Sequence, residues 1–301
     1  MSATRIPARR LVRALDRISP RLAATMTYPT FIRVGARRPV REEERATHEQ
    51  ASRSVIDVGR RRVVTYQWGS GPKTVLLVHG WRGRASQFAA LVRELTYEGY
   101  RVVAFDAPGC GESPGRRTNI GDYYAAVAEL ADLEPEPFHA IVSHSVGSLA
   151  ALAVTSEHAA TRRLVAVSAI TRFRYLSEKF ARIAGLSESA RGVLEARYGR
   201  RLRNSAPDVY NRFDFTAAGL PNDLRLSFIH DRKDRWAEID EVRRLVAMHG
   251  GAPKLMETEG FGHSRTLSAD ATLDAVLAAV SDSERTEVQA ADPTLVPLAE
   301  D

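Results

Sequence analysis

Three side chains in this 301-residue sequence have the types and the order needed to break an acyl bond. Ser145 offers a hydroxyl, Asp234 a carboxylate and His263 an imidazole. A serine hydroxyl is a poor nucleophile near neutral pH, so it needs a base within hydrogen-bond reach and a third group that orients this base. The three residues therefore predict nucleophilic catalysis by serine, provided that the fold brings them together.

The surroundings of Ser145 support this interpretation. The serine stands between a predicted strand at 139–143 and a predicted helix at 146–158, within the string Ser-His-Ser-Val-Gly. A nucleophile elbow has the pattern Gly-x-Ser-x-Gly between a strand and a helix. The sequence differs from it at Ser143, which takes the place of the first glycine. Because the sharp turn leaves room only for small side chains, serine is small enough to be tolerated there.

The candidate acid and base also follow predicted strands. Asp234 comes after the strand at 224–230, and His263 comes after the strand at 253–257. The carboxyl ends of parallel strands meet at one edge of a sheet, so both loops would lie at the same edge as the serine. Asp231 lies in the same loop as Asp234, and we keep it as the alternative acid.

The elements that must position these residues follow a regular alternation. Residues 54–58 and 62–67 predict a hairpin, and short apolar runs then alternate with amphipathic stretches, as in a parallel sheet with crossover helices. Further strands are predicted at 74–79, 101–106 and 164–169, and helices at 86–98, 121–133, 239–249 and 271–280. The predicted fold is therefore α/β, a doubly wound and mostly parallel sheet over residues 54–280. About residues 171–216 break the alternation with helical periodicity, which favours a helical cap or, alternatively, additional scaffold.

Several motifs between about Thr74 and Val280 resemble those of the α/β-hydrolase superfamily. The string His-Gly-Trp at 79–81 resembles the oxyanion loop of the family, and residues 106–113 resemble its Asp-x-x-Gly-x-Gly-x-Ser segment. Family members carry Gly-x-x-Asp after the late strand, with the aspartate as the triad acid. Here Asp231 occupies the glycine position, so the resemblance implies that Asp234 is the acid.

The resemblance implies a serine hydrolase that cleaves a carboxylic ester, or a thioester, through an acyl-enzyme and without a cofactor. Ser145 would attack the carbonyl, His263 would carry the proton, and Asp234 would hold the imidazole. The backbone NH groups of Trp81 and Val146 would bind the oxyanion. A peptidase or a carbon–carbon hydrolase on the same triad, and a catalytically silent binding protein of this fold, remain as alternatives.

The other reactive residue types predict no further chemistry. No histidine pair has metal-ligand spacing, and the glycines of residues 109–115 do not follow a strand as a dinucleotide-binding loop would. Cys110, the only cysteine, excludes an internal disulfide and has no acid or base beside it. We expect His79 to fix the oxyanion loop, and we expect His144 to point away from the serine because side chains alternate along a strand.

Charge is unevenly distributed along the chain. Residues 1–62 contain 15 arginines against six acidic residues, whereas residues 281–301 contain one arginine against six. The basic character therefore belongs to an N-terminal helical arm, residues 1–53, and no aromatic-interleaved basic motif predicts binding to nucleic acid. Residues 281–301 predict a disordered acidic tail.

The arm itself contains one clear helical pattern. Apolar residues at helical spacing predict a helix over residues 9–18 that ends before Pro20, whereas residues 41–49 predict a solvated connector. The helix would dock on the body of the protein or, alternatively, contact a membrane surface.

We expect a small acyl molecule as the substrate. No apolar run is long enough to span a bilayer or to form a signal core, which predicts a cytoplasmic location. Nothing in the sequence predicts the oligomeric state.

Overall fold

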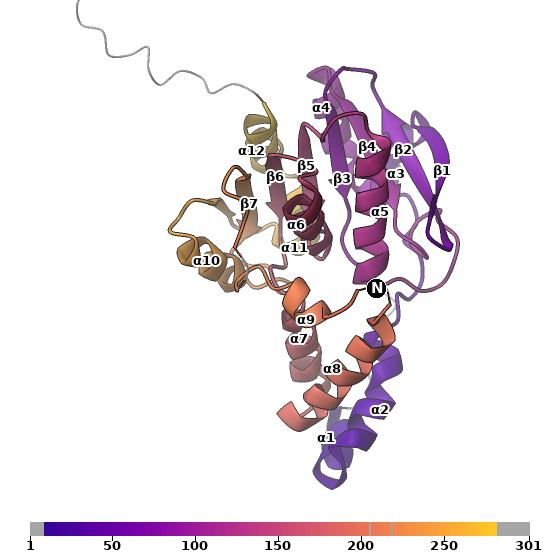
Figure 1. Cartoon of the computed structure of the whole chain (residues 1–301), viewed down its shortest axis with the longest axis vertical. Coiled ribbons are helices and arrows are strands. Elements are labelled where there is room, and N and C mark those ends of the chain that lie inside the picture. Colours follow the sequence, from indigo (N-terminus) through magenta and orange to yellow (C-terminus); the bar gives the residue numbers. More distant parts are fainter. Residues whose placement is uncertain (1–8, 205, 218, 282–301) are drawn as a thin grey trace, which may run out of the picture.

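The computed structural model describes residues 9–281 except residues 205 and 218, and an eight-stranded sheet lies at its centre (Figure 1). The strand order is β1-β2-β4-β3-β5-β6-β7-β8. β2 pairs antiparallel with β1 and with β4, and every other pair is parallel. The strands are β1 Ser52–Val58, β2 Arg61–Trp68, β3 Thr74–Val78, β4 Arg101–Asp106, β5 Ala140–His144, β6 Arg163–Val167, β7 Arg225–Asp231 and β8 Lys254–Thr258.

Helices cover both faces of the sheet, which confirms the predicted doubly wound α/β fold. α5 and α6 lie side by side in front of the sheet in Figure 1, and α4 and α12 pack together on the other face. The helices are α1 Arg9–Ile18, α2 Pro20–Phe31, α3 Glu42–Glu49, α4 Ala89–Tyr97, α5 Ile120–Leu133, α6 Gly147–His158, α7 Arg174–Ala184, α8 Glu188–Leu202, α9 Val209–Arg212, α10 Ile239–Met248, α11 Gly262–Arg265 and α12 Asp270–Val280. Two 3-10 turns, η1 Ala85–Phe88 and η2 Thr266–Ser268, complete the regular structure.

The central strands are buried on both sides, and their side chains divide between two cores. In β3, Leu76 and Val78 belong to the core beneath α5 and α6, whereas Val75 and Leu77 belong to the core beneath α4 and α12. Successive side chains of a strand point to opposite faces, so a strand between two helix layers must be apolar throughout. This explains why the continuous apolar runs of the sequence are strands.

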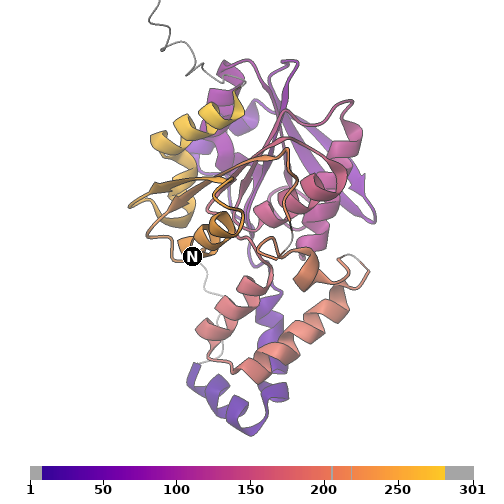
Figure 2. The same ribbon diagram turned by 60° about the vertical axis from the view of Figure 1, so that its left-hand side comes forward.

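Four helices form a separate lobe at the carboxyl edge of the sheet (Figures 1 and 2). α1 and α2 come from the N-terminus, α7 and α8 come from the insertion after β6, and α2 packs along α8. Phe31 joins the two pairs, because its ring centroid lies 5.1 Å from that of Phe180 on α7 and 5.2 Å from that of Tyr198 on α8. We call α1, α2, α7 and α8 the helical lobe.

The N-terminal segment differs from the sequence prediction after residue 18. α1 has the predicted bounds, but a second helix begins at once because Pro20 occupies its first turn and the Ser19 hydroxyl accepts a hydrogen bond from Leu22 N. Proline lacks only an NH group that is unpaired at this position in any case. Pro20 therefore starts α2 as well as limiting α1.

The prediction of a solvated connector at residues 41–49 is wrong. These residues contain α3, which is packed on the sheet domain through buried polar contacts. The carboxylate of Glu44 accepts a hydrogen bond of 2.6 Å from Ser86 Oγ, and Thr47 O accepts one of 2.7 Å from Trp68 Nε1.

The predicted acidic tail, residues 281–301, lies outside the described residues except for its first residue. Among the helices of residues 9–281, none has both the length and the apolar character needed to span a membrane.

Candidate active site

Ser145 occupies the tight turn between β5 and α6. Its φ of +55° lies in the left-handed region, which is costly for a residue with a side chain. Backbone hydrogen bonds hold this conformation, because Ser145 N donates to Val167 O at 3.0 Å and Ser148 N donates to Ser145 O at 3.0 Å. The neighbouring strand and the first turn of the helix thus impose the strained backbone that a nucleophile elbow requires.

Small residues allow the chain to approach itself around this turn. A Cβ on Gly147 would lie 2.6 Å from His79 O, and one on Gly80 would lie 2.9 Å from the Cβ of Ser145. Ser143, which replaces the first glycine of the usual pattern, is fully buried, and its hydroxyl donates to Ser148 Oγ at 3.1 Å. Serine is tolerated at this position because its one polar atom has a partner.

Asp234 and His263 come together at the carboxyl edge of the sheet. His263 Nδ1 donates to Asp234 Oδ2 at 2.8 Å, and the other carboxylate oxygen accepts from Trp236 N at 2.8 Å and Ala237 N at 3.0 Å. Burial acts to raise the pKa of Asp234, but these hydrogen bonds hold it below its usual value. The ionised carboxylate fixes the proton of His263 on Nδ1 and leaves Nε2 as the acceptor.

Asp231, the alternative acid, has a different set of partners. Its carboxylate accepts hydrogen bonds from Phe261 N at 2.9 Å and Lys233 N at 2.9 Å, together with one from Thr258 Oγ1 at 3.2 Å. These contacts link the loop after β7 to the loop after β8. Asp231 therefore holds the two loops together, while Asp234 is the carboxylate that contacts His263.

Ser145 and His263 are neighbours through His144. Among the described residues, no hydrogen bond joins Ser145 Oγ to the His263 ring. The His144 ring lies instead against the His263 ring, with centroids 4.8 Å apart, and His144 Nε2 donates to His263 O at 2.9 Å. The residue before the serine thus fixes both the ring and the backbone of His263. Strand alternation did not suggest this contact.

The environment of His144 keeps its ring neutral. The side chain is buried, and desolvation together with the nearby His263 lowers the pKa of His144 to about 3. A neutral ring that donates from Nε2 to a carbonyl carries its proton on that nitrogen. His144 is therefore a fixed hydrogen-bond donor at neutral pH and cannot take up a proton in place of His263.

The predicted oxyanion loop lies against the serine turn. His79 Nδ1 donates to Gly80 O at 2.7 Å, Tyr123 Oη donates to the same oxygen at 2.9 Å, and Ala107 N donates to His79 Nε2 at 2.9 Å. His79 fixes this loop by hydrogen bonds, as the sequence predicted. The NH groups of Trp81 and Val146 make no hydrogen bond within the described residues, which leaves both able to bind an oxyanion.

Residues 106–113 form a structural turn beneath the oxyanion loop. The buried Asp106 carboxylate accepts from Tyr66 Oη at 2.8 Å, Ala85 N at 2.7 Å and Glu112 N at 2.7 Å. A Cβ on Gly111 would overlap this carboxylate, which explains the glycine. Cys110 is buried in the same turn, and burial raises the pKa of its thiol to about 12, which disfavours a role as nucleophile.

The insertion after β6 is tied to the loop that carries Asp234. Tyr175 Oη, at the start of α7, donates to Trp236 O and accepts from Glu238 N, each at 3.0 Å. Just before α7, Arg172 Nε donates to Glu241 Oε2 at 2.6 Å.

Within the described part of the chain, no cluster of three His, Cys, Asp or Glu side chains could hold a metal ion.

Comparisons with known proteins agree with this fold. A family model described as "Alpha/beta hydrolase family" matches residues 75–293. Among solved structures, mouse alpha/beta hydrolase domain-containing protein 10 is 14% identical, with a TM-score of 0.59, and the match covers 76% of this chain and 97% of that chain. A Pyrococcus furiosus esterase is 21% identical, with a TM-score of 0.59 and coverage of 81% and 95%. The thioesterase domain of the curacin biosynthetic pathway is 14% identical, with a TM-score of 0.53 and coverage of 76% and 98%.

Proposed function

The chain belongs to the α/β-hydrolase family, and on this premise we propose that it is a serine hydrolase that cleaves carboxylic esters or thioesters through an acyl-enzyme. The observation that carries the proposal is the 2.8 Å hydrogen bond between His263 Nδ1 and Asp234 Oδ2, beside a serine held at φ +55°. A strained serine, an oriented imidazole and a buried carboxylate are the three parts that acyl transfer requires.

The proposed reaction begins with Ser145 Oγ attacking the acyl carbonyl while His263 Nε2 takes the hydroxyl proton. The NH groups of Trp81 and Val146 would stabilise the oxyanion, with each donor worth about 3 kcal/mol in the transition state. His263 would then return the proton to the leaving alcohol or thiol. A water molecule, activated by the same imidazole, would hydrolyse the acyl-enzyme. The contact between Ser145 and His263 is expected to tighten when substrate binds.

We propose that residues 171–216, which contain α7, α8 and α9, cap the site. The contacts of Tyr175 and Arg172 support this role, because Tyr175 joins the start of the insertion to the loop that holds Asp234 and Arg172 joins it to α10, the helix that follows this loop. A cap in this place would select substrates by the length of the acyl chain. A series of p-nitrophenyl esters of increasing chain length tests this role, and a flat activity profile would exclude it.

Labelling of the purified protein by a fluorophosphonate probe tests the triad. We expect the wild type to be labelled and Ser145→Ala to be unlabelled, because the probe phosphonylates the activated serine. Asp234→Asn should slow labelling about 10³- to 10⁴-fold, because the imidazole loses the partner that fixes its tautomer. His263→Ala should be at least as slow.

Asp231→Asn is the matched control for Asp234→Asn. Because Asp231 contacts backbone NH groups and Thr258 rather than the imidazole, we expect it to label within about tenfold of the wild type. Thermal unfolding of each variant shows whether the fold is retained. If Asp231→Asn abolishes labelling while Asp234→Asn does not, the acid assignment is wrong.

A second candidate is a catalytically silent binding protein of the same fold. The lack of a hydrogen bond between Ser145 Oγ and His263 within the described residues favours it. This candidate predicts that a folded wild-type protein is never labelled by the probe. Labelling that disappears in Ser145→Ala would exclude it.

A further inference from the structure

The N-terminal half of the helical lobe exposes a row of apolar side chains. Leu11 is 52% exposed and Ile18 is 78% exposed, and with the exposed Ala14 they follow the i, i+3, i+7 spacing that places residues on one side of a helix. Val12 faces the opposite way and is buried. α1 thus uses its other side for packing and leaves this apolar row without a partner in the described structure.

Two further apolar residues extend the exposed surface beyond α1. Leu22, in the first turn of α2, is 57% exposed, and Ile183, near the end of α7, is 42% exposed. The turn between α1 and α2 lies at the end of the lobe farthest from the sheet (Figure 2). The exposed apolar groups therefore lie on a protruding part of the molecule. We call Leu11, Ile18, Leu22 and Ile183 the apolar tip.

The same part of the chain has a large excess of positive charge. Residues 9–41 contain nine arginines and one acidic residue, Asp16. The carboxylate of Asp16 accepts hydrogen bonds from Ser187 N at 2.5 Å and Ser187 Oγ at 2.9 Å. Arg9, Arg13 and Arg17 form no ion pair with any carboxylate of the described residues. Their charge is thus available to an anion from outside the molecule.

A groove of about 440 Å³ lies where α1 meets the turn between α7 and α8. Arg9, Arg13, Asp16 and Arg17 line it from α1, and Arg182, which pairs with Glu238 at 2.8 Å, and Ser187 line it from the other side. The side chains of Arg9 and Arg13 pack against Gly185, which brings them to this turn. A groove with this lining has the charge and the size to hold a phosphate headgroup.

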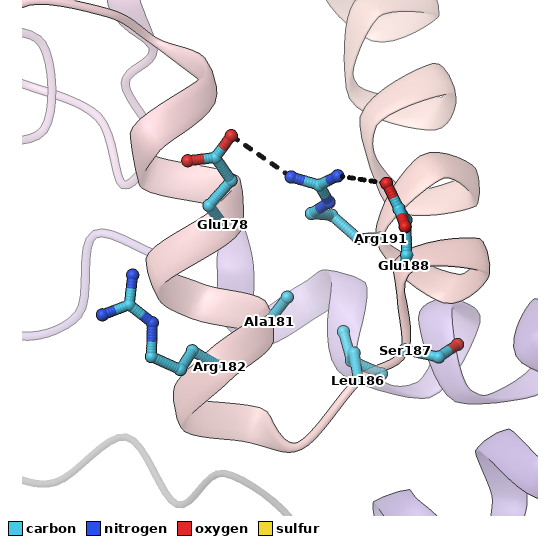
Figure 3. Close-up of a pocket in the computed structure, with 7 residues that line it drawn as sticks. All are labelled: Glu178, Ala181, Arg182, Leu186, Ser187, Glu188 and Arg191. Atoms are coloured by element: carbon cyan, nitrogen blue, oxygen red, sulfur yellow. Dashed lines mark hydrogen bonds and ion pairs between the residues drawn. The ribbon is translucent and has the colours of Figure 1, made fainter.

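A second hollow, of about 260 Å³ between α7 and α8, differs in its charges (Figure 3). There Arg191 is placed between two glutamates and pairs with Glu178 and with Glu188, each at 3.2 Å. This arginine is neutralised within the protein. Arg9, Arg13 and Arg17, which have no carboxylate partner in the described structure, therefore mark the first groove, and not the second hollow, as the anion site.

We propose that the helical lobe docks on the surface of an anionic lipid bilayer. The apolar tip enters the boundary between headgroups and acyl chains, while Arg9, Arg13 and Arg17 contact lipid phosphates. Helices that lie in a membrane interface combine an exposed apolar row with basic residues beside it, and they bind more strongly when the lipids are negatively charged. The proposal concerns binding alone and does not depend on the proposed catalysis.

The charge also disfavours a second copy of the chain as the occupant. In a two-fold dimer the same patch of both copies meets, so the unpaired arginines would face each other and repel. A bilayer that contains phosphatidylglycerol has negative charge over its whole surface. The bilayer therefore complements the apolar tip and the arginines together.

Flotation of the full-length protein with lipid vesicles tests the proposal. We expect binding to vesicles of phosphatidylcholine with 30% phosphatidylglycerol to be at least tenfold stronger than binding to pure phosphatidylcholine, and to weaken at 0.5 M salt. The double variant Ile18→Asp/Leu22→Asp should lose at least tenfold in binding, because it places charges in the apolar boundary. Arg13→Glu/Arg17→Glu should lose a similar factor on the anionic vesicles.

Leu133→Asp is the matched control for the apolar tip. Leu133 is 59% exposed at the end of α5, outside the lobe, so this variant should bind as the wild type does. Thermal unfolding checks that every variant is folded. Equal binding to neutral and anionic vesicles, or unchanged binding of the double variants, would overturn the proposal. The proposal would also be overturned if the wild type binds no vesicles and runs as a dimer in size-exclusion chromatography, while Ile18→Asp/Leu22→Asp runs as a monomer.

Discussion

At the scale of single residues, the candidate site depends on a histidine that is given no chemical role in the proposed reaction. His144 donates to His263 O at 2.9 Å and packs against its ring, so the position of the base depends on His144 remaining neutral. Protonation would place a positive charge in a buried site beside the imidazole. His144 is therefore a positioning residue, and its environment links the site to pH.

The lowered pKa of His144 predicts how stability changes with pH. Below about pH 6.5 the unfolded chain binds a proton at this residue, whereas the folded protein does not until about pH 3. Stability from the neutral ring is thus complete above pH 6.5 and is lost as the pH falls towards 3. His144→Gln removes this loss. Between pH 7 and pH 4.5 the free energy of unfolding of this variant should therefore fall by about 2 to 3 kcal/mol less than that of the wild type.

Urea unfolding at both pH values measures this difference. The comparison uses the change with pH within each protein, because the substitution also alters stability at pH 7. Burial lowers the pKa of His79 and His230 as well, but both histidines are present in both proteins. Equal losses of stability in the wild type and in His144→Gln would show that folding does not lower the pKa of His144.

Residue types and their order predicted that an acid after β7 would meet His263, and the resemblance to the α/β-hydrolase superfamily selected Asp234 over Asp231. The sequence could not show the contact of His144, because this contact depends on the path of the loop after β8. Alternation along a strand gives the direction of a side chain only while the strand continues. His144 is the last residue of β5, and the turn at Ser145 follows it directly.

At the scale of elements, the turn between β5 and α6 depends on the lack of a side chain at Gly147. In Gly147→Ala the new Cβ would lie 2.6 Å from His79 O and 2.7 Å from Val78 O, both backbone atoms that cannot move aside independently. We expect a loss of about 1 to 3 kcal/mol in the free energy of unfolding. The variant should also lose labelling by the fluorophosphonate probe.

Gly192→Ala provides the control for this substitution. Gly192 lies within α8, and apart from its chain neighbours and the backbone of its own helix no atom lies within 4 Å of the position that its Cβ would take. Alanine favours a helix over glycine by about 1 kcal/mol, so this variant should be more stable than the wild type. If thermal unfolding shows the same effect for both substitutions, the close approach at Gly147 has no energetic consequence.

The elements of the sheet domain were predictable because apolar runs and amphipathic stretches alternate clearly. Their predicted ends lie within about two residues of those in the structure. α2 and α3 were missed for different reasons. Pro20 was interpreted only as the end of a helix, and the three acidic residues at the start of α3 suggested a solvated segment although Glu44 is buried.

At the scale of the whole molecule, the helical lobe joins two segments that are far apart in the sequence. Phe31 contacts both Phe180 and Tyr198, so Phe31→Ala should loosen the lobe and lower the free energy of unfolding by about 2 kcal/mol. Limited proteolysis should then cleave the lobe sooner than the sheet domain. Tyr97→Ala, which changes an 87% exposed ring on α4, should leave the cleavage rate unchanged.

Faster cleavage that begins in the sheet domain would contradict this role of Phe31.

The sequence indicated that residues 9–18 form a helix and that residues 171–216 are helical. It could not show that the two pack together, because the periodicity of each segment reports only that it has an apolar face and not which face covers it. The packing of these two distant segments against each other could therefore be seen only in the structure.

The order in which the two halves of the lobe are synthesised has a consequence for folding in the cell. α2 ends about 140 residues before α7 begins, so a ribosome that adds about 5 to 20 residues per second completes α2 roughly 7 to 30 s before it starts α7. During this interval Phe180 and Tyr198, the ring partners of Phe31, have not yet been synthesised. Assembly of the lobe is therefore a late step, because α1 and α2 can complete their packing only after α7 and α8 have been synthesised.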